Sequence, residues 1–258
     1  DVRPELAPRS FDSLARAATP ALAVHFDASG LSGERGKPLR LVVHQDASIG
    51  IPGVLYDASL ILAARLVAEP SLLGVAGCRG ARPPSKVLEL GCGTAVAGLT
   101  AAALGAAVVC TDRSRTALRL VEKSAAANGH STFGNHDVRV KVERWDWDEE
   151  MPPCCSGAQV ILVADLVYTE GGSRALLSAL SKAAGKECTV LVVFKLRDAQ
   201  VRKAIFEFLA GARKLFSECV ALPLEPLAAV AVENSEGEPR PGVTEDSLKR
   251  LYLYRLRR

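Results

Sequence analysis

Residues 87–94 read Val-Leu-Glu-Leu-Gly-Cys-Gly-Thr, and this short stretch decides the fold. Its first half is apolar except for Glu89, which is the composition of a short buried strand. Gly91 and Gly93 follow with one residue between them, and glycines allow the backbone to turn sharply and to approach a ligand closely. A strand that runs through a tight glycine turn into a helix is typical of α/β folds that bind a nucleotide-like cofactor.

Helix-like and strand-like segments alternate around this turn. Apolar spacing predicts helices over residues 57–68, 95–104, 114–127, 173–184 and 199–210. Short apolar runs predict strands over residues 39–44, 87–90, 107–111, 138–142, 160–164 and 189–194. This alternation predicts a mostly parallel sheet with right-handed crossover connections.

The two ends of the chain depart from the alternation. Residues 1–50 are predicted to form an N-terminal β extension, and residues 51–258 to form one α/β domain. Residues 216–222 and 249–256 resemble strands without a long helix between them, so they are expected to pair as an antiparallel hairpin. Residues 233–242 are polar and rich in glycine and proline, which predicts an exposed, mobile loop.

The composition argues against several classes of protein. No uninterrupted apolar run reaches the roughly 18 residues that a membrane helix needs. The seven cysteines lack regular spacing and zinc-site partners, so neither a disulfide scaffold nor a metal site is expected. The net charge of +3 comes from interspersed acids and bases, which neither require nor exclude nucleic acid. No segment resembles a secretory signal, and a cytoplasmic protein is expected.

Two cofactors compete for the glycine turn. A dinucleotide fingerprint needs a third glycine, but Val96 stands at that position and Gly98 comes two residues late. S-adenosylmethionine carries no phosphate, and a carboxylate such as Glu89 would attract its positive sulfonium and ammonium groups. Asp112, at the end of the next strand, suits the ribose hydroxyls of either cofactor. The pattern therefore favours S-adenosylmethionine over NAD.

Five segments of the chain resemble the family-16, METTL21-like group of class I methyltransferases. They are Tyr56-Asp57-Ala58-Ser59, Glu89-Leu90-Gly91-Cys92-Gly93-Thr94, Thr111-Asp112, Trp147 and Ala164-Asp165-Leu166-Val167-Tyr168. The resemblance implies a seven-stranded, Rossmann-like α/β sheet that is mostly parallel and ends in an antiparallel C-terminal hairpin. It also implies S-adenosylmethionine as cofactor and a protein substrate, with lysine the commonest acceptor and histidine or arginine used by some relatives.

The resemblance assigns cofactor contacts to the glycine turn and to the strand ends beside it. Gly91, Cys92 and Gly93 would follow the methionine and ribose of the cofactor. Asp112 would bind the ribose hydroxyls, and Glu89 is the acidic residue ahead of the turn.

Further cofactor contacts are assigned to aromatic residues and to one backbone position. Trp147 would pack on the adenine, with Trp145 as its rival for that role. Ala164 would approach the cofactor through its backbone. Tyr56 stands where the family has tryptophan, and it would form part of the wall of the site.

Asp165 and Tyr168 are the predicted catalytic residues. A lysine ammonium, with a pKa of about 10.4 in water, has no free lone pair, so it must lose a proton before methyl transfer. A desolvated slot beside the positive sulfur lowers that pKa. Asp165 is expected to orient the amine or to take its proton through water, while Tyr56 and Tyr168 line the path of the cationic side chain.

The expected substrate is a lysine of a cytosolic protein of chaperone or translation-factor type. The expected enzyme is a monomer in the cytoplasm and also the nucleus, with neither a membrane nor a nucleic acid as partner. Two other functions remain open. One is a small-molecule methyltransferase on the same core, and the other is a non-catalytic interaction protein that binds the cofactor.

Overall fold

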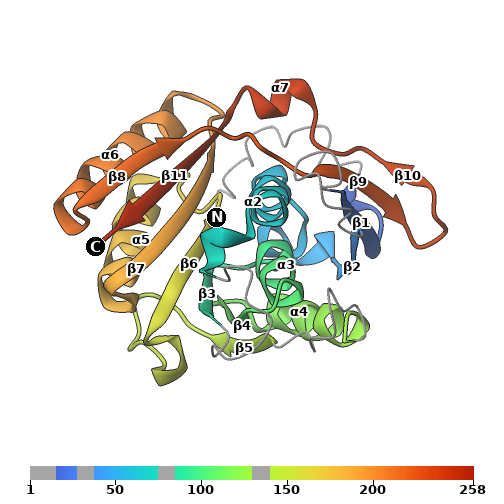
Figure 1. Cartoon of the computed structure of the whole chain (residues 1–258), viewed down its shortest axis with the longest axis horizontal. Coiled ribbons are helices and arrows are strands. Elements are labelled where there is room, and N and C mark those ends of the chain that lie inside the picture. Colours follow the sequence, from blue (N-terminus) through green and yellow to red (C-terminus); the bar gives the residue numbers. More distant parts are fainter. Residues whose placement is uncertain (1–15, 28–37, 75–84, 130–139) are drawn as a thin grey trace, which may run out of the picture.

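The structure is a computed structural model that describes residues 16–27, 38–74, 85–129 and 140–258. Its main sheet has seven strands in the order β5-β4-β3-β6-β7-β11-β8 (Figure 1). In that order the strands are Val140–Arg144, Ala107–Asp112, Lys86–Leu90, Ala158–Ala164, Ala184–Lys195, Leu251–Arg257 and Glu218–Leu222. The strands from β5 to β7 are parallel, and β11 runs antiparallel to both of its neighbours. The predicted sheet is confirmed, although residues 138–139 of the predicted β5 lie outside the described residues.

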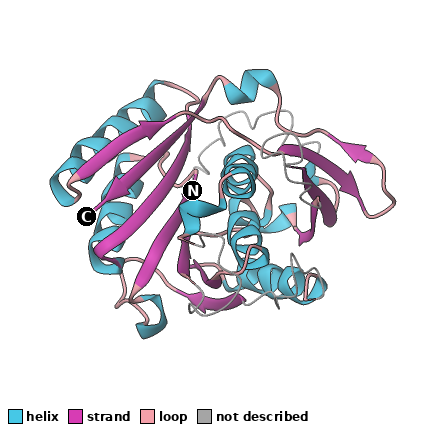
Figure 2. Cartoon of the chain, viewed as in Figure 1, coloured by secondary structure: helices cyan, strands magenta, loops and turns pink. Residues whose placement is uncertain are grey.

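Helices cover both faces of this sheet (Figure 2). One face packs against α5 and α6, and the other packs against α2, α3 and α4. These helices are α2 (Asp57–Ala68), α3 (Val96–Ala103), α4 (Arg115–Ala127), α5 (Glu170–Ala183) and α6 (Ala199–Leu215). Among the described residues, no helix is long and apolar enough to cross a membrane.

Helix α6 continues past its predicted end at residue 210 because Gly211 serves packing, not termination. A Cβ atom at Gly211 would lie 2.3 Å from Leu177 Cδ1 of α5. The glycine therefore allows the two helices to approach closely, and it is tolerated inside α6 for that reason.

A second, four-stranded sheet joins the two ends of the chain. Its order is β10-β9-β1-β2, with all neighbours antiparallel. The strands are β1 (Ala21–Asp27), β2 (Leu39–His44), β9 (Ala229–Asn234) and β10 (Pro239–Arg240). The short helices that lie wholly within the described residues are η1 (Ala47–Ile49), η2 (Ile51–Gly53), η3 (Pro70–Leu73), η4 (Pro153–Cys155) and α7 (Glu245–Leu248).

Residues 235–239 are exposed, as predicted for the loop over residues 233–242, but the expectation of a loop without strands is wrong, because this segment contains the end of β9, a turn and β10. Asn234 fixes the turn: its Oδ1 accepts the backbone N–H groups of Glu236 (3.0 Å) and Glu238 (2.8 Å). The asparagine side chain thus replaces backbone partners within the turn. Polar composition alone does not reveal such a contact.

Strand β1 was not predicted from the sequence, although buried and more exposed residues alternate along part of it, as in a half-buried strand. Leu22, Val24 and Phe26 are buried and pack with α2 and α3, so both helices lie between the two sheets (Figure 1).

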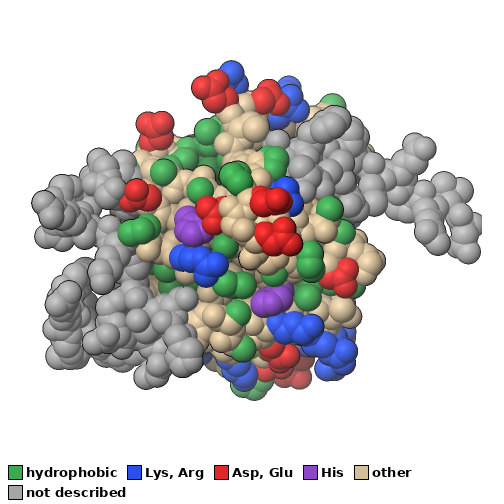
Figure 3. Space-filling view, turned by 90° about the vertical axis from the view of Figure 1, so that its right-hand side faces the viewer, with side chains coloured by type: hydrophobic (Ala, Val, Ile, Leu, Met, Phe, Trp, Pro, Cys, Tyr) green, Lys and Arg blue, Asp and Glu red, His purple; other side chains and the backbone are tan. Residues whose placement is uncertain are grey.

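On the molecular face at the right of Figure 1, acidic, basic, histidine and hydrophobic side chains are interspersed (Figure 3). Among the described residues of that face, no single-charge stripe of the kind that binds nucleic acid is visible.

The side chain of the residue that caps the C-terminal end of α4 closes the open edge of β2. Asn128 directly follows the helix and is fully buried. Its Oδ1 accepts the N–H of Val42 (2.8 Å), and its Nδ2 donates to the carbonyl oxygen of Val42 (2.7 Å). One amide side chain therefore satisfies both backbone groups of a strand residue, as a neighbouring strand would do.

We expect Asn128→Ala to lower the free energy of unfolding by about 2 kcal/mol, because both Val42 backbone groups lose their partner. Urea denaturation measures this change. Arg119→Ala, on an exposed position of the same helix, is the matched control and should change stability by less than about 0.5 kcal/mol. Equal effects of the two substitutions would contradict the edge-closing role.

Candidate active site

The glycine turn between β3 and α3 has left-handed backbone at every second residue. Gly91, Gly93 and Ala95 have φ angles of 53°, 52° and 56°. A Cβ atom at Gly91 would lie 2.7 Å from Leu166 Cδ2, and one at Gly93 would lie 3.2 Å from Pro52 O. These two positions therefore favour glycine both for their conformation and for the space around them.

Cys92 and Asp112 fasten this turn to the end of β4. The N–H of Cys92 donates to Thr111 O (2.8 Å). Asp112 Oδ2 accepts the N–H of Gly93 (3.1 Å), and its Oδ1 accepts the N–H of Ser114 (2.8 Å). Burial raises the pKa of Asp112 above its usual range. Each carboxylate oxygen retains a lone pair for a further donor, such as a ribose hydroxyl.

The side chain of Glu89 lies in the layer between the main sheet and α3. Its Oε2 accepts the N–H of Gly98 (2.9 Å) and lies 3.7 Å from Cys110 Sγ. Complete burial raises the pKa of Glu89 to about 8. The acid is therefore mainly protonated at neutral pH, which weakens the charge attraction for the cofactor that the sequence led us to expect, and it holds the first turn of α3 against the sheet. Its contact with a cofactor stays a prediction.

Asp165 follows the last residue of β6, Ala164, and has a left-handed backbone with φ of 58°. Its side chain is only 7% exposed and forms an ion pair with Arg197. Arg197 Nη1 donates to Oδ1 (3.0 Å), and Nη2 donates to Oδ2. The N–H of Lys195 adds a longer contact to Oδ1 (3.3 Å). Both oxygens of the predicted catalytic carboxylate thus accept hydrogen bonds within the protein.

The two predicted tyrosines lie around this ion pair. Tyr168 is 40% exposed, and partial burial raises the pKa of its hydroxyl, with further influence from Arg113, Asp165 and other charges nearby. Burial would lower the pKa of Arg197, but Asp165 and Tyr56 act against this and raise it above its ordinary value. The structure therefore brings Tyr56, Asp165 and Tyr168 to one edge of the sheet, beside Asp112.

The two tryptophans differ in their burial. Trp145 is 1% exposed and belongs to the core beneath α5, and its backbone N–H donates to Asp112 O (3.2 Å). Trp147 packs against the same core but is only partly buried, and its carbonyl oxygen accepts Lys182 Nζ (2.8 Å). The more open ring is Trp147, and its adenine contact stays a prediction.

A buried charge network beside the ion pair was not predicted from the sequence. Asp57, at the start of α2, has a fully buried carboxylate. Its Oδ1 pairs with Arg16, and its Oδ2 accepts Lys195 Nζ (2.6 Å) and Ser247 Oγ (2.5 Å). Burial acts to raise the pKa of Asp57, but Arg16 and these hydrogen bonds bring it below its usual range. The only sequence signal was the position of Asp57 beside Tyr56.

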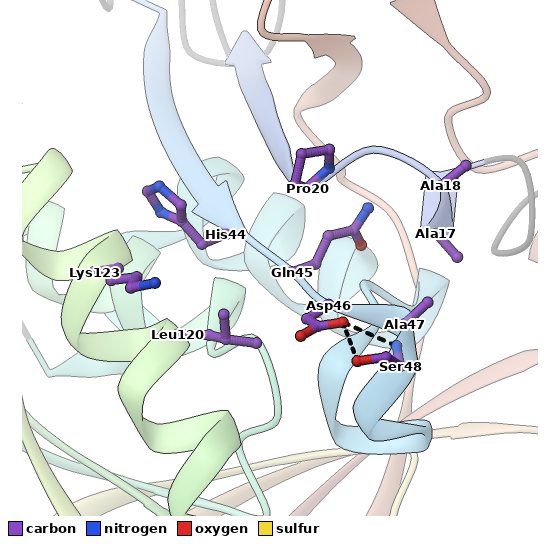
Figure 4. Close-up of a pocket in the computed structure, with 10 residues that line it drawn as sticks. All are labelled: Ala17, Ala18, Pro20, His44, Gln45, Asp46, Ala47, Ser48, Leu120 and Lys123. Atoms are coloured by element: carbon purple, nitrogen blue, oxygen red, sulfur yellow. Dashed lines mark hydrogen bonds between the residues drawn. The ribbon is translucent and has the colours of Figure 1, made fainter.

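A separate hollow of about 430 Å³ lies beside η1 and α4 (Figure 4). His44, Gln45 and Lys123 line it, together with Asp46, whose carboxylate accepts the N–H and the hydroxyl of Ser48 at 2.9 and 2.6 Å. Burial and the charge of Lys123 lower the pKa of His44. No predicted site residue lines this hollow, so it is distinct from the candidate active site.

We expect Glu89→Gln to remove a pH dependence of stability. The pKa of Glu89 rises from 4.5 in the unfolded chain to about 8 in the folded one, so the unfolded chain releases this proton first. The native protein therefore loses stability as pH rises from 4.5 to about 8, by up to roughly 1.4 kcal/mol per pH unit. Urea denaturation at pH 5 and pH 8 should show the variant gaining stability relative to the wild type. A constant difference across this range would contradict the buried, protonated acid.

We expect Gly98→Ala to destabilise the protein by about 2 kcal/mol, because the new Cβ would lie 2.4 Å from Glu89 Oε2. The matched control is Gly171→Ala in α5, where no atom lies within 4 Å of the new Cβ. Helix propensity predicts that this control stabilises the protein by roughly 0.5 kcal/mol. Thermal unfolding of both variants checks the pair, and opposite signs are the expected outcome.

A family model and two relatives that match the sequence of this chain are all described as lysine methyltransferases. The family described as "Lysine methyltransferase" matches residues 36–212. EEF1A lysine methyltransferase 3 of Xenopus tropicalis is 30% identical over 163 residues, which are 63% of this chain and 66% of that protein. Protein N-lysine methyltransferase METTL21A of Danio rerio is 32% identical over 181 residues, which are 69% of this chain and 75% of that protein.

A solved structure supports the fold alone. The S-adenosylmethionine-dependent methyltransferase SibL is 18% identical, with a TM-score of 0.50, over 78% of this chain and 55% of that chain. The family match covers more than half of the chain and includes the glycine turn, Asp112 and the Asp165–Arg197 ion pair. The predicted family and the S-adenosylmethionine cofactor are therefore confirmed, and this chain belongs to the lysine methyltransferase family.

Proposed function

We propose that this chain transfers a methyl group from S-adenosylmethionine to a lysine side chain of another protein. The observation that carries the proposal is the meeting of four strand ends at one edge of the main sheet. The glycine turn ends β3, Asp112 ends β4, Asp165 follows β6, and Arg197 follows β7. Parallel sheets bind their ligands at this carboxyl edge.

The residues at this edge fit the cofactor. A Cβ atom at Gly91 or at Gly93 would crowd neighbouring atoms of the protein. Because neither glycine has a side chain, the backbone at these two positions can approach a ligand closely. Asp112 is held by two backbone N–H groups with lone pairs left for the ribose hydroxyls. Trp147 and the backbone of Ala164 would complete the site. When bound, S-adenosylmethionine supplies a methyl group on a positively charged sulfur.

The acceptor lysine must arrive without its proton, and the chain's own residues would prepare it. Tyr56 and Tyr168 would line its path and exclude water, and desolvation lowers the pKa of an ammonium group. Asp165 would orient the amine through the lone pairs that Arg197 leaves free. Alignment of amine and methyl group accounts for most of the expected acceleration, because the leaving group is already activated.

The name of the Xenopus tropicalis relative suggests the substrate class to test first. It is a lysine methyltransferase of elongation factor 1A, so we propose a translation factor as substrate, in the cytoplasm and also the nucleus. A chaperone substrate is the second choice, and we propose that the enzyme acts as a monomer. The test distinguishes this proposal from three alternatives: histidine or arginine as the acceptor, a small-molecule substrate, and a non-catalytic role.

The test is incubation of the purified chain with methyl-labelled S-adenosylmethionine and a cell extract, alongside purified elongation factor 1A. We expect a labelled protein band whose hydrolysate contains methyl-lysine. Label only in the small-molecule fraction would favour a metabolite substrate, and methyl-histidine or methyl-arginine would change the acceptor. Cofactor binding without any label would favour the non-catalytic role.

Asp165→Asn should lower the rate of methyl transfer at saturating cofactor by at least about tenfold, because the amide cannot orient the amine as a carboxylate does. Initial rates with the labelled substrate measure this effect. Asp148→Asn, at an exposed position outside the site, is the matched control and should keep the wild-type rate. Full activity of Asp165→Asn would remove Asp165 from the mechanism and leave the cofactor site unaffected.

A further inference from the structure

We propose that Arg197 is a positioning residue for the cofactor-binding turn, acting through Asp165 and Leu166. The proposal rests on the proposed function only in taking S-adenosylmethionine as the ligand of this turn. Arg197 follows β7, whereas the turn follows β3, so the chain provides no direct connection between them. A continuous series of contacts joins the two.

The first contact is the ion pair between Arg197 and Asp165. The guanidinium meets both carboxylate oxygens, and Nη1 also donates to Lys195 O at 3.3 Å. The Asp165 side chain is 7% exposed and that of Arg197 is 27% exposed, so water competes little for the carboxylate. Two parallel hydrogen bonds fix the direction of the carboxylate as well as its position.

The second contact is the backbone turn at Asp165. Its φ of 58° lies in the left-handed region, which is unfavourable for residues with a Cβ atom and least so for aspartate and asparagine. Such a conformation persists when its surroundings hold it in place. Here the ion pair holds the side chain, and the N–H of Asp165 donates to Val193 O (2.8 Å).

The third contact is between Leu166 and Gly91. The chain bends at Asp165, and the Leu166 side chain lies over Gly91 of the glycine turn. A Cβ atom at Gly91 would be 2.7 Å from Leu166 Cδ2 and 2.9 Å from its Cδ1. Gly91 itself has a φ of 53°. A displaced Leu166 would therefore leave the first residue of the cofactor-binding turn without the side chain that packs on it.

The test measures the affinity of the full chain for S-adenosylhomocysteine by calorimetry, which requires no acceptor protein. We expect Arg197→Met to weaken binding about tenfold, since charge-assisted hydrogen bonds contribute this much or more. Arg197→Lys should give most of the same loss, because an ammonium cannot make two parallel hydrogen bonds to the carboxylate. Arg202→Met, at an exposed position of α6, is the matched control and should bind as the wild type does.

A double-mutant cycle with Leu166→Ala separates positioning from direct contact. If Arg197 acts through Leu166, Arg197→Met should have little further effect in the Leu166→Ala background. If the two losses multiply, or if Arg197→Met binds with wild-type affinity, the proposal is overturned. Thermal unfolding checks that each variant is folded, and Arg197→Lys takes the place of Arg197→Met in the cycle should the latter fail to fold.

The outcomes also separate this proposal from the proposed function. A wild-type chain that binds S-adenosylhomocysteine but labels no protein would overturn only the proposed function. Methyl-lysine formation together with independent effects of Arg197 and Leu166 would overturn only the positioning role. A wild-type chain that does not bind the cofactor product would overturn both.

Discussion

The buried carboxylate of Asp57 is the interaction on which the arrangement of the molecule depends. It has no exposed surface and meets donors from three distant segments: Arg16 before β1, Lys195 at the end of β7, and Ser247 in α7. A buried charge without its partner is costly, about 3–5 kcal/mol when one member of a pair is removed. Each partner therefore holds its segment against the start of α2.

This network links the second sheet to the edge of the main sheet that carries the candidate active site. Arg16 also donates to the carbonyl oxygens of Pro241 (2.8 Å) and Gly242 (3.1 Å), which follow β10. Lys195 donates hydrogen bonds from its Nζ to the Asp57 carboxylate and from its backbone N–H to the Asp165 carboxylate. The same lysine therefore serves two carboxylates, one that holds the fold together and one predicted to serve the chemistry. Residues far from the site thus help to set its shape.

Sequence patterns predicted the elements that depend on local order. The alternation of apolar runs predicted the strands and helices of the main sheet, and the spacing of Gly91 and Gly93 predicted the tight turn between β3 and α3. Contacts between residues that are far apart in the sequence produce no local sequence pattern from which they could be predicted. Asp57 and Lys195 are 138 positions apart, and Asp165 and Arg197 are 32 apart, so nothing near either carboxylate identifies its partner. The β9–β10 hairpin was missed for a different reason, because the Asn234 turn has the composition of a loop.

The pairing of Asp165 with Arg197 changes the interpretation of the proposed reaction. A bare carboxylate beside an incoming lysine would stabilise the ammonium form and raise its pKa, which opposes formation of the nucleophile. In this site the guanidinium already balances that charge, while the carboxylate retains lone pairs that can orient an amine. In the proposed reaction, the ion pair would therefore orient the acceptor without strong attraction for its proton. In that reaction, deprotonation would depend on desolvation between Tyr56 and Tyr168 and on the positive charge that the bound cofactor would supply, and Arg197 would support the reaction by holding Asp165.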